Sequence, residues 1–89
     1  MQLCTSNAEF DCIQLNKDNV KEVMKFYGFN IDDLRHGHFV EVKDYGVECG
    51  VIGAYTAKIP YGYWMVYNEG YEIKSNADFN EQYTLLKTT

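Results

Sequence analysis

The chain has 89 residues, of which 46% are hydrophobic and 24% are charged, and it contains one proline. This length and composition predict a single globular domain over residues 1–89 and exclude collagen-like or low-complexity architecture. The net charge of −5 comes without a basic patch, which argues against direct binding to DNA or RNA. The apolar runs are too short to cross a bilayer, so we expect a soluble protein in the cytoplasm, with no membrane partner.

Three cysteines, Cys4, Cys12 and Cys49, are widely spaced along the chain. No C-x-x-C pair is present, so neither a zinc ribbon nor a thioredoxin-like motif is expected. Their odd number argues against a secreted disulfide framework. We therefore expect three reduced, mostly buried thiols.

The first half of the chain predicts a strand followed by a helix. Residues 8–16 (AEFDCIQLN) carry apolar residues on both faces of a strand, which is typical of a central strand. Residues 18–28 then change to helical spacing, with an apolar stripe formed by Val20, Val23, Met24 and Tyr27. Asn19 can cap this helix, with Glu22 at the third helical position, and Gly28 suits the left-handed position beyond its end.

The second half predicts strands and a last helix. Residues 29–37 indicate a loop or a single helical turn, 38–44 a strand, and 47–59 a longer strand bent at Gly50 and Gly53. Residues 63–67 and 71–75 form a hairpin around the turn NEG. A helix over 76–87 follows, capped by Ser75, with Phe79, Tyr83 and Leu86 on one face.

These elements predict an α+β fold of order β-α-β-β-β-β-α. Strands linked by hairpins indicate one antiparallel sheet of about four to five strands, and the two amphipathic helices would cover one face of it.

Two stretches resemble a family of small, largely uncharacterised proteins encoded by phages and prophages. Members read approximately V-x-V-x-A-x-Q-W-x-G-D-N, then a helix, and later G-D-W-I-V, a G-E turn and F-x-x-x-Y. The first part is similar to residues 8–28, through Ile13, Gln14, Asn19, Glu22, Val23, Phe26 and Gly28. The second is similar to residues 56–83, through Gly62, Trp64, Gly70, Phe79 and Tyr83. The resemblance implies the fold and a phage or prophage origin, and it allows an anti-CRISPR or other anti-defence role.

One stretch, DDLRHGH at 32–38, could ligate a metal. His36 and His38 with Asp32 or Asp33 offer imidazole and carboxylate ligands, which suit zinc, manganese or iron. A closed site needs three or four ligands, whereas H-x-H supplies two, and adjacent aspartates after a helix are more often solvated. We expect no metal and no cofactor, and keep a small metal-dependent enzyme as a second alternative.

The aromatic residues of the predicted hairpin favour a binding surface. Alternation places Tyr63, Met65 and Tyr67 on one face of the strand and Trp64 and Val66 on the other, toward the helices. A thin domain has little room to bury both faces, and exposed tyrosines are common in interfaces. The alternative is an ordinary sheet in which tyrosine is a good strand former. The candidate partner-binding residues are Tyr61, Tyr63, Tyr67, Tyr71, Glu48, Glu69 and Glu72.

The hypothesis that follows is a small phage-encoded protein, not an enzyme, that binds a host factor stoichiometrically and inhibits it sterically. The expected partner is a host protein or ribonucleoprotein complex in the host cytoplasm, with a CRISPR effector as the first candidate. Tyr63 is the best single candidate for a specific contact, because members of the phage family that the chain resembles tend to carry an acid at that position. The first alternative is a self-associating phage structural or accessory protein, for which a homodimer is possible.

Overall fold

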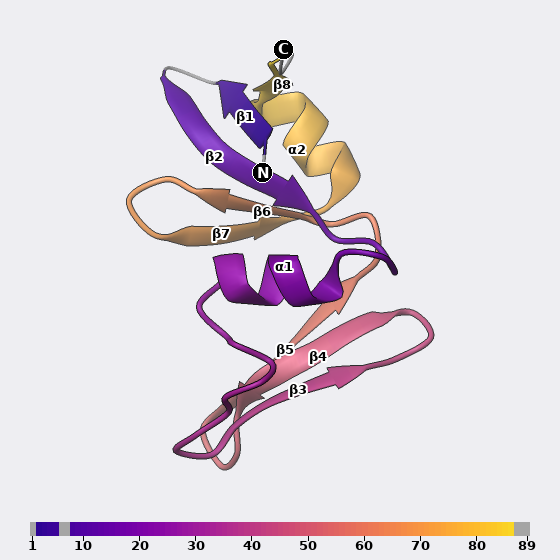
Figure 1. Ribbon diagram of the computed structural model, residues 1–89. Helices are drawn as coiled ribbons and strands as arrows, with labels where there is room; N and C mark the ends of the chain where they lie inside the picture. Colours follow the sequence, from indigo (N-terminus) through magenta and orange to yellow (C-terminus); the bar gives the residue numbers. More distant parts are fainter. Residues whose placement is uncertain (1, 6–7, 87–89) are drawn as a thin grey trace. The chain divides into compact units, whose positions relative to one another are not determined.

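The computed structural model describes residues 2–5 and 8–86 (Figure 1). Within these residues the helices and strands are β1 (Gln2–Thr5), β2 (Glu9–Gln14), α1 (Val20–Phe26), β3 (His38–Val42), β4 (Gly46–Val51), β5 (Tyr55–Pro60), β6 (Trp64–Tyr67), β7 (Tyr71–Lys74), α2 (Asn76–Gln82) and β8 (Thr84–Leu85). All strand pairs are antiparallel. The predicted α+β class is therefore confirmed.

The strands form two sheets rather than the one sheet that we predicted. One sheet has five strands in the order β7-β6-β2-β1-β8, and the other has three in the order β3-β4-β5. The chain divides into two compact units: a five-stranded unit, residues 1–14 and 62–89, and a three-stranded unit, residues 15–61. Each unit contains one of the two described helices, and the prediction that both helices cover one sheet stays a prediction. The expectation of one domain over residues 1–89 stays a prediction.

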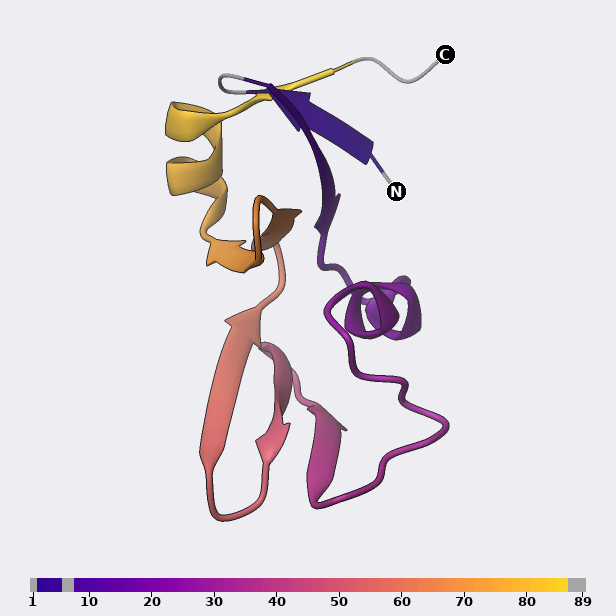
Figure 2. The ribbon, with the colours of Figure 1, turned by 90° about the vertical axis from the view of Figure 1, so that its left-hand side faces the viewer.

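The predicted long strand over 47–59 is a hairpin of β4 and β5. The chain reverses at residues 52–54, where the amide of Ala54 donates to the carbonyl of Val51 at 3.0 Å. Gly53 takes a φ of +81° in this turn, a conformation that glycine adopts without the steric cost of a side chain. The predicted change of direction at Gly53 is therefore present, but it is a full reversal of the chain rather than a bend within one strand. The β4–β5 loop and its two strands are visible in Figure 2.

Two short strands were not predicted. β1 pairs with β2, and β8 pairs with β1, as the yellow and indigo segments show in Figure 2. The predicted last helix is shorter than expected because Tyr83 is already extended, at φ −131° and ψ 150°. Leu86 therefore lies beyond the helix, where its amide donates to the carbonyl of Leu3 at 2.9 Å.

The helix-boundary predictions have different outcomes. The Ser75 hydroxyl accepts a hydrogen bond from the amide of Asp78 at 3.2 Å, which confirms the cap of α2. Gly28 has a φ of +96°, as expected for the residue beyond the end of α1. Asn19 is the first boundary residue of α1, but its side chain accepts from the amide of Asn16 at 2.8 Å and makes no capping bond. It closes the preceding turn instead.

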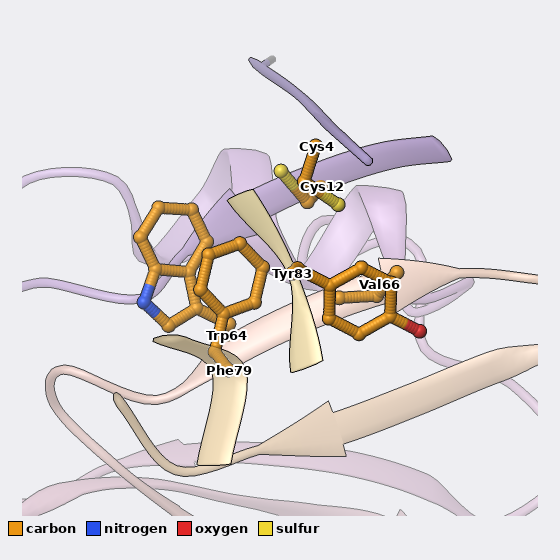
Figure 3. Close-up of a cluster of buried hydrophobic side chains, with 6 residues drawn as sticks. All are labelled: Cys4, Cys12, Trp64, Val66, Phe79 and Tyr83. Carbon is orange, nitrogen blue, oxygen red and sulfur yellow. The ribbon is translucent and has the colours of Figure 1, made fainter. Parts of the chain in front are cut away.

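The core of the five-stranded unit forms between its sheet and α2 (Figure 3). The rings of Trp64 and Phe79 stack with centroids 4.0 Å apart, and Phe79 stacks on Tyr83 at 5.5 Å. The Trp64 indole N–H donates to Asn76 at 3.0 Å, so this polar group of a buried side chain is satisfied. The other buried members of the cluster are Cys4, Cys12 and Val66. The prediction that Trp64 and Val66 face a helix is confirmed.

The three-stranded unit has its own buried apolar positions. A row across the sheet joins Val42, Val47 and Ile59, of which the last two are fully buried. A Cβ on Gly46 would lie 2.0 Å from the carbonyl oxygen of Ile59, so only glycine fits where β4 begins. Beyond α1, the ring of Phe29 packs against His38 with centroids 5.2 Å apart.

Candidate functional site

The five-stranded sheet has two faces of opposite character. Its register places Cys12, Val66 and Glu72 in one cross-strand row, on the face that α2 covers, here called the helix face. Side chains alternate along a strand, so the neighbouring row points the other way. That opposite face is here called the tyrosine face.

Four strands contribute to one exposed row on the tyrosine face. Leu3 of β1 lies opposite Asp11 of β2, Asp11 opposite Tyr67 of β6, and Tyr67 opposite Tyr71 of β7. Leu3 is 37% exposed, Tyr67 48% and Tyr71 47%, and Asp11 is also exposed. An aromatic pair, a carboxylate and an aliphatic side chain therefore form a continuous exposed strip across the sheet.

The next row on the same face is buried. Ile13, Met65 and Ile73 are cross-strand neighbours, with Met65 fully buried and Ile73 partly buried. Met65 therefore lies on the same face as Tyr67, as alternation predicts, but it is fully buried there. β6 is buried on both sides at Trp64, Met65 and Val66, and it becomes exposed only at its last residue.

Tyr67 and Tyr71 are held by the hairpin that joins their strands. Their ring centroids lie 5.0 Å apart with an interplanar angle of 65°, an edge-to-face contact. The turn between them is closed by the amide of Asn68, which donates to the carbonyl of Gly70 at 2.8 Å. Glu69 has a φ of +57° at the tip of this turn. The two rings are therefore positioned before any partner binds.

The charges around the strip are negative. Glu9 precedes Asp11 by two residues on the same face of β2, and Glu69 follows Tyr67 in the turn. At the strand positions of this face that the structure describes, no lysine or arginine occurs. The basic residue Lys74 pairs in register with Trp64, which places it on the helix face.

The acidic excess of the chain is concentrated in this unit. From the sequence, the five-stranded unit has six acidic and two basic residues, a net charge of −4. The three-stranded unit has seven acidic and six basic residues, a net charge of −1. These add to the −5 of the whole chain. One of the two bases, Lys87, lies outside the described residues.

Three of the predicted partner-binding residues come together on or beside the tyrosine face: Tyr67, Tyr71 and Glu69. Glu72 does not join them, because it lies on the helix face and accepts a hydrogen bond from the Tyr83 hydroxyl at 2.9 Å. Tyr63 is half-buried and lies just before β6. Its selection for a specific contact stays a prediction.

The other two, Glu48 and Tyr61, belong to the three-stranded unit. Glu48 accepts a hydrogen bond from the Tyr45 hydroxyl at 2.6 Å, and this bond raises the pKa of Tyr45 to about 12. The Tyr61 hydroxyl donates to the carbonyl of Lys43 at 3.2 Å. Both side chains therefore have partners within their own unit.

Sequence reasoning missed Leu3 and Asp11 as members of the strip. Asp11 was visible as a polar residue alternating with Phe10 and Cys12 in a strand. The pairing of Asp11 with Tyr67 joins residues far apart in sequence, and no local pattern indicates it.

The stretch considered for a metal is engaged in surface ion pairs. Asp32 pairs with Lys21 at 2.5 Å, and Asp33 with Arg35 at 2.7 Å. In the part of the chain that the structure describes, no group of three or more His, Cys, Asp or Glu side chains is placed to hold a metal ion. The metal hypothesis for His36 and His38 stays untested, and metal analysis of chelator-free protein would test it.

The three cysteines are free and fully buried, as predicted. Burial raises the pKa of all three thiols, and for Cys12 it raises the pKa to about 12, with a further contribution from the hydrogen bond to Cys4. A thiol with a raised pKa is a poor nucleophile near neutral pH, because the thiolate is the reactive form.

Comparison with known proteins gives no relatives: no family model, no curated protein and no solved structure matches this chain. Among the described residues, no helix has the length and apolar character needed to cross a membrane.

Proposed function

We propose that this protein acts by binding another protein stoichiometrically through the tyrosine face, and that it inhibits that partner sterically. The observation that carries the proposal is the exposed strip of Leu3, Asp11, Tyr67 and Tyr71, which crosses four strands. Tyrosine brings apolar area and a hydroxyl at a low cost in side-chain entropy, and for this reason it is enriched in interfaces.

Electrostatics indicates the kind of partner. The tyrosine face has three carboxylates in or beside the strip, and it belongs to the unit with a net charge of −4. Such a surface attracts a basic surface, and this attraction speeds association and sets the orientation of the partner. Basic protein surfaces of this kind bind nucleic acid. With the resemblance to phage proteins, this favours a host nucleic-acid-binding protein or ribonucleoprotein, a CRISPR effector being the first candidate, in the host cytoplasm. Occupation of its basic surface would block access of the nucleic acid.

The test uses tagged protein against a panel of purified CRISPR effector complexes, together with a plaque assay in cells that carry the matching system. We expect capture of one complex and protection of the phage. The double variant Tyr67→Ala/Tyr71→Ala should remain folded and lose both, since truncation of a central interface aromatic weakens binding by about tenfold or more. The matched control is Tyr55→Ala, which removes a tyrosine that is 52% exposed in the other unit.

Two outcomes would contradict the proposal. No capture and no phage protection by the wild-type protein would remove the anti-defence role. A stable oligomer in solution that the double variant dissociates would instead support self-association through the same strip.

A further inference from the structure

We propose that the tyrosine face recognises an arginine side chain of its protein partner, with the guanidinium stacked on the Tyr67 ring beside Tyr71 and paired with Asp11. This inference rests on the proposed function and specifies the chemistry that the strip selects.

The first step is the position of Asp11. Residues directly opposite each other on antiparallel strands have Cβ atoms about 4.5–5.5 Å apart. Asp11 lies directly opposite Tyr67, which lies directly opposite Tyr71. A cation placed over the Tyr67 ring is therefore within reach of the Asp11 carboxylate.

The second step is the absence of a competing cation in the described part of the strip. The strip contains the carboxylate of Asp11, and the carboxylates of Glu9 and Glu69 lie beside it. The basic residue Lys74 lies on the helix face. On the helix face, the Glu72 carboxylate accepts a hydrogen bond from the Tyr83 hydroxyl. Three ion pairs among the described residues, Lys21–Asp32, Arg35–Asp33 and Lys43–Glu41, lie in the three-stranded unit. No lysine or arginine occupies a described strand position of the tyrosine face, so the charge of this face favours a positively charged partner.

The third step distinguishes arginine from lysine. A guanidinium is planar, is less strongly hydrated than an ammonium group, stacks on aromatic rings and donates to a carboxylate through two N–H groups at once. The edge-to-face pair of Tyr67 and Tyr71 exposes aromatic surface beside a carboxylate, which matches these properties. A lysine would gain the charge attraction but little of the stacking.

The experiment compares octa-arginine with octa-lysine, two peptides of equal charge, by titration calorimetry with the full chain near physiological salt. We expect octa-arginine to bind about two- to fivefold more tightly, the range that an exposed cation–π contact supplies. Tyr67→Ala/Tyr71→Ala should abolish this preference. Asp11→Asn should weaken octa-arginine binding by a similar factor. The control Glu81→Gln, which removes one charge from exposed α2, should leave the preference intact.

Equal affinities of the two peptides, or equal losses for Asp11→Asn and Glu81→Gln, would mean attraction by net charge alone and would overturn the arginine assignment. If a captured complex still depends on Tyr67 and Tyr71 in that case, the proposed function stands and this inference fails. Tighter binding of single-stranded DNA than of octa-arginine at the same residues would also overturn it. Loss of fold in a variant is checked by circular dichroism, and Tyr67→Leu then replaces Tyr67→Ala, because it retains apolar volume without the ring.

Discussion

The two faces of the five-stranded sheet use the same kind of residue in opposite ways. On the helix face, Trp64, Phe79 and Tyr83 stack on one another, and their polar atoms are paired with Asn76 and Glu72. On the tyrosine face, Tyr67 and Tyr71 contact each other and remain about half exposed. The burial of these aromatic side chains therefore distinguishes those that pack in the core from those that are exposed, whereas their residue type does not.

The comparison also separates two uses of carboxylates. Glu72 is part-buried and stabilises a core tyrosine, whereas Asp11 is exposed beside a surface tyrosine. Replacement of the first should affect folding, and replacement of the second should affect binding. The predictions below test this division, from the largest expected effect on stability to the smallest.

Trp64→Ala should have the largest effect. The variant loses the stacking on Phe79 and the hydrogen bond to Asn76, and it leaves a cavity in a core that contains few large residues. We expect a loss of about 3–5 kcal/mol in the free energy of unfolding, comparable to the total stability of a small domain. Urea denaturation followed by circular dichroism measures it.

The matched variant for that experiment is Tyr67→Ala, because Tyr67 lies on the same strand as Trp64 but is about half exposed on the tyrosine face. Its cost should be below about 1 kcal/mol, the range of one cross-strand pair. Similar losses for the two variants would show that Tyr67 serves the core as Trp64 does, and the division between core and surface aromatics would be wrong.

Tyr83→Phe should have an intermediate effect. The hydroxyl donates to the Glu72 carboxylate at 2.9 Å, and its removal leaves that part-buried carboxylate without this donor. We expect a loss of about 1–2 kcal/mol, since hydrogen bonds to charged groups are stronger than neutral ones. Tyr67→Phe, which removes an exposed hydroxyl, is the control and should be close to neutral.

The same variant has a pH signature. Burial raises the pKa of Tyr83 above its usual value of 10.0; the hydrogen bond from Asn68 opposes this shift, and the Glu72 bond and charge add to it. The unfolded chain releases this proton at lower pH than the folded chain does. The contribution of Tyr83 to stability is therefore fully present below pH 10 and is lost as the pH rises through the folded pKa. As the pH rises above 10, wild type should therefore lose stability more steeply than Tyr83→Phe; parallel curves would contradict this.

Local sequence patterns predicted much of the fold. The hairpin of β6 and β7, the start of α2 at Ser75 and the glycine after α1 each depend on a few neighbouring residues, and all are confirmed. β1 and β8 were missed because they have four and two residues, too few for an alternating pattern to identify a strand. The β4–β5 turn was missed because residues 52–54, Ile-Gly-Ala, contain none of the Asn, Asp or Pro residues typical of turns.

The candidate site was predicted only in part, for the same reason. Alternation alone places Tyr67 and Tyr71 on one face, because the hairpin register is local. The same alternation places Glu72 on the other face, away from the two tyrosines. Asp11 could not be found, because the pairing of β2 with β6 brings together residues that are remote in the chain. Surfaces built across non-local strand pairs need the topology before they can be recognised.

Ser75→Ala should reduce stability less than Trp64→Ala and Tyr83→Phe do. It tests whether the stability of α2 affects the helix face only or also affects binding by the tyrosine face. α2 has seven residues, too few to be a stable helix by itself, so its order depends on the Ser75 cap and on the burial of Phe79. Loss of the hydroxyl that accepts from Asp78 should cost about 1 kcal/mol, and Ser75→Asp, an equally good cap, should restore it. Hydrogen exchange at the Asp78 amide should quicken in Ser75→Ala and recover in Ser75→Asp.

Because α2 covers the helix face, the octa-arginine affinity of the folded variant should stay at the wild-type value. A parallel loss of affinity would show that the two faces are coupled, and the tyrosine face could no longer be regarded as an independent surface.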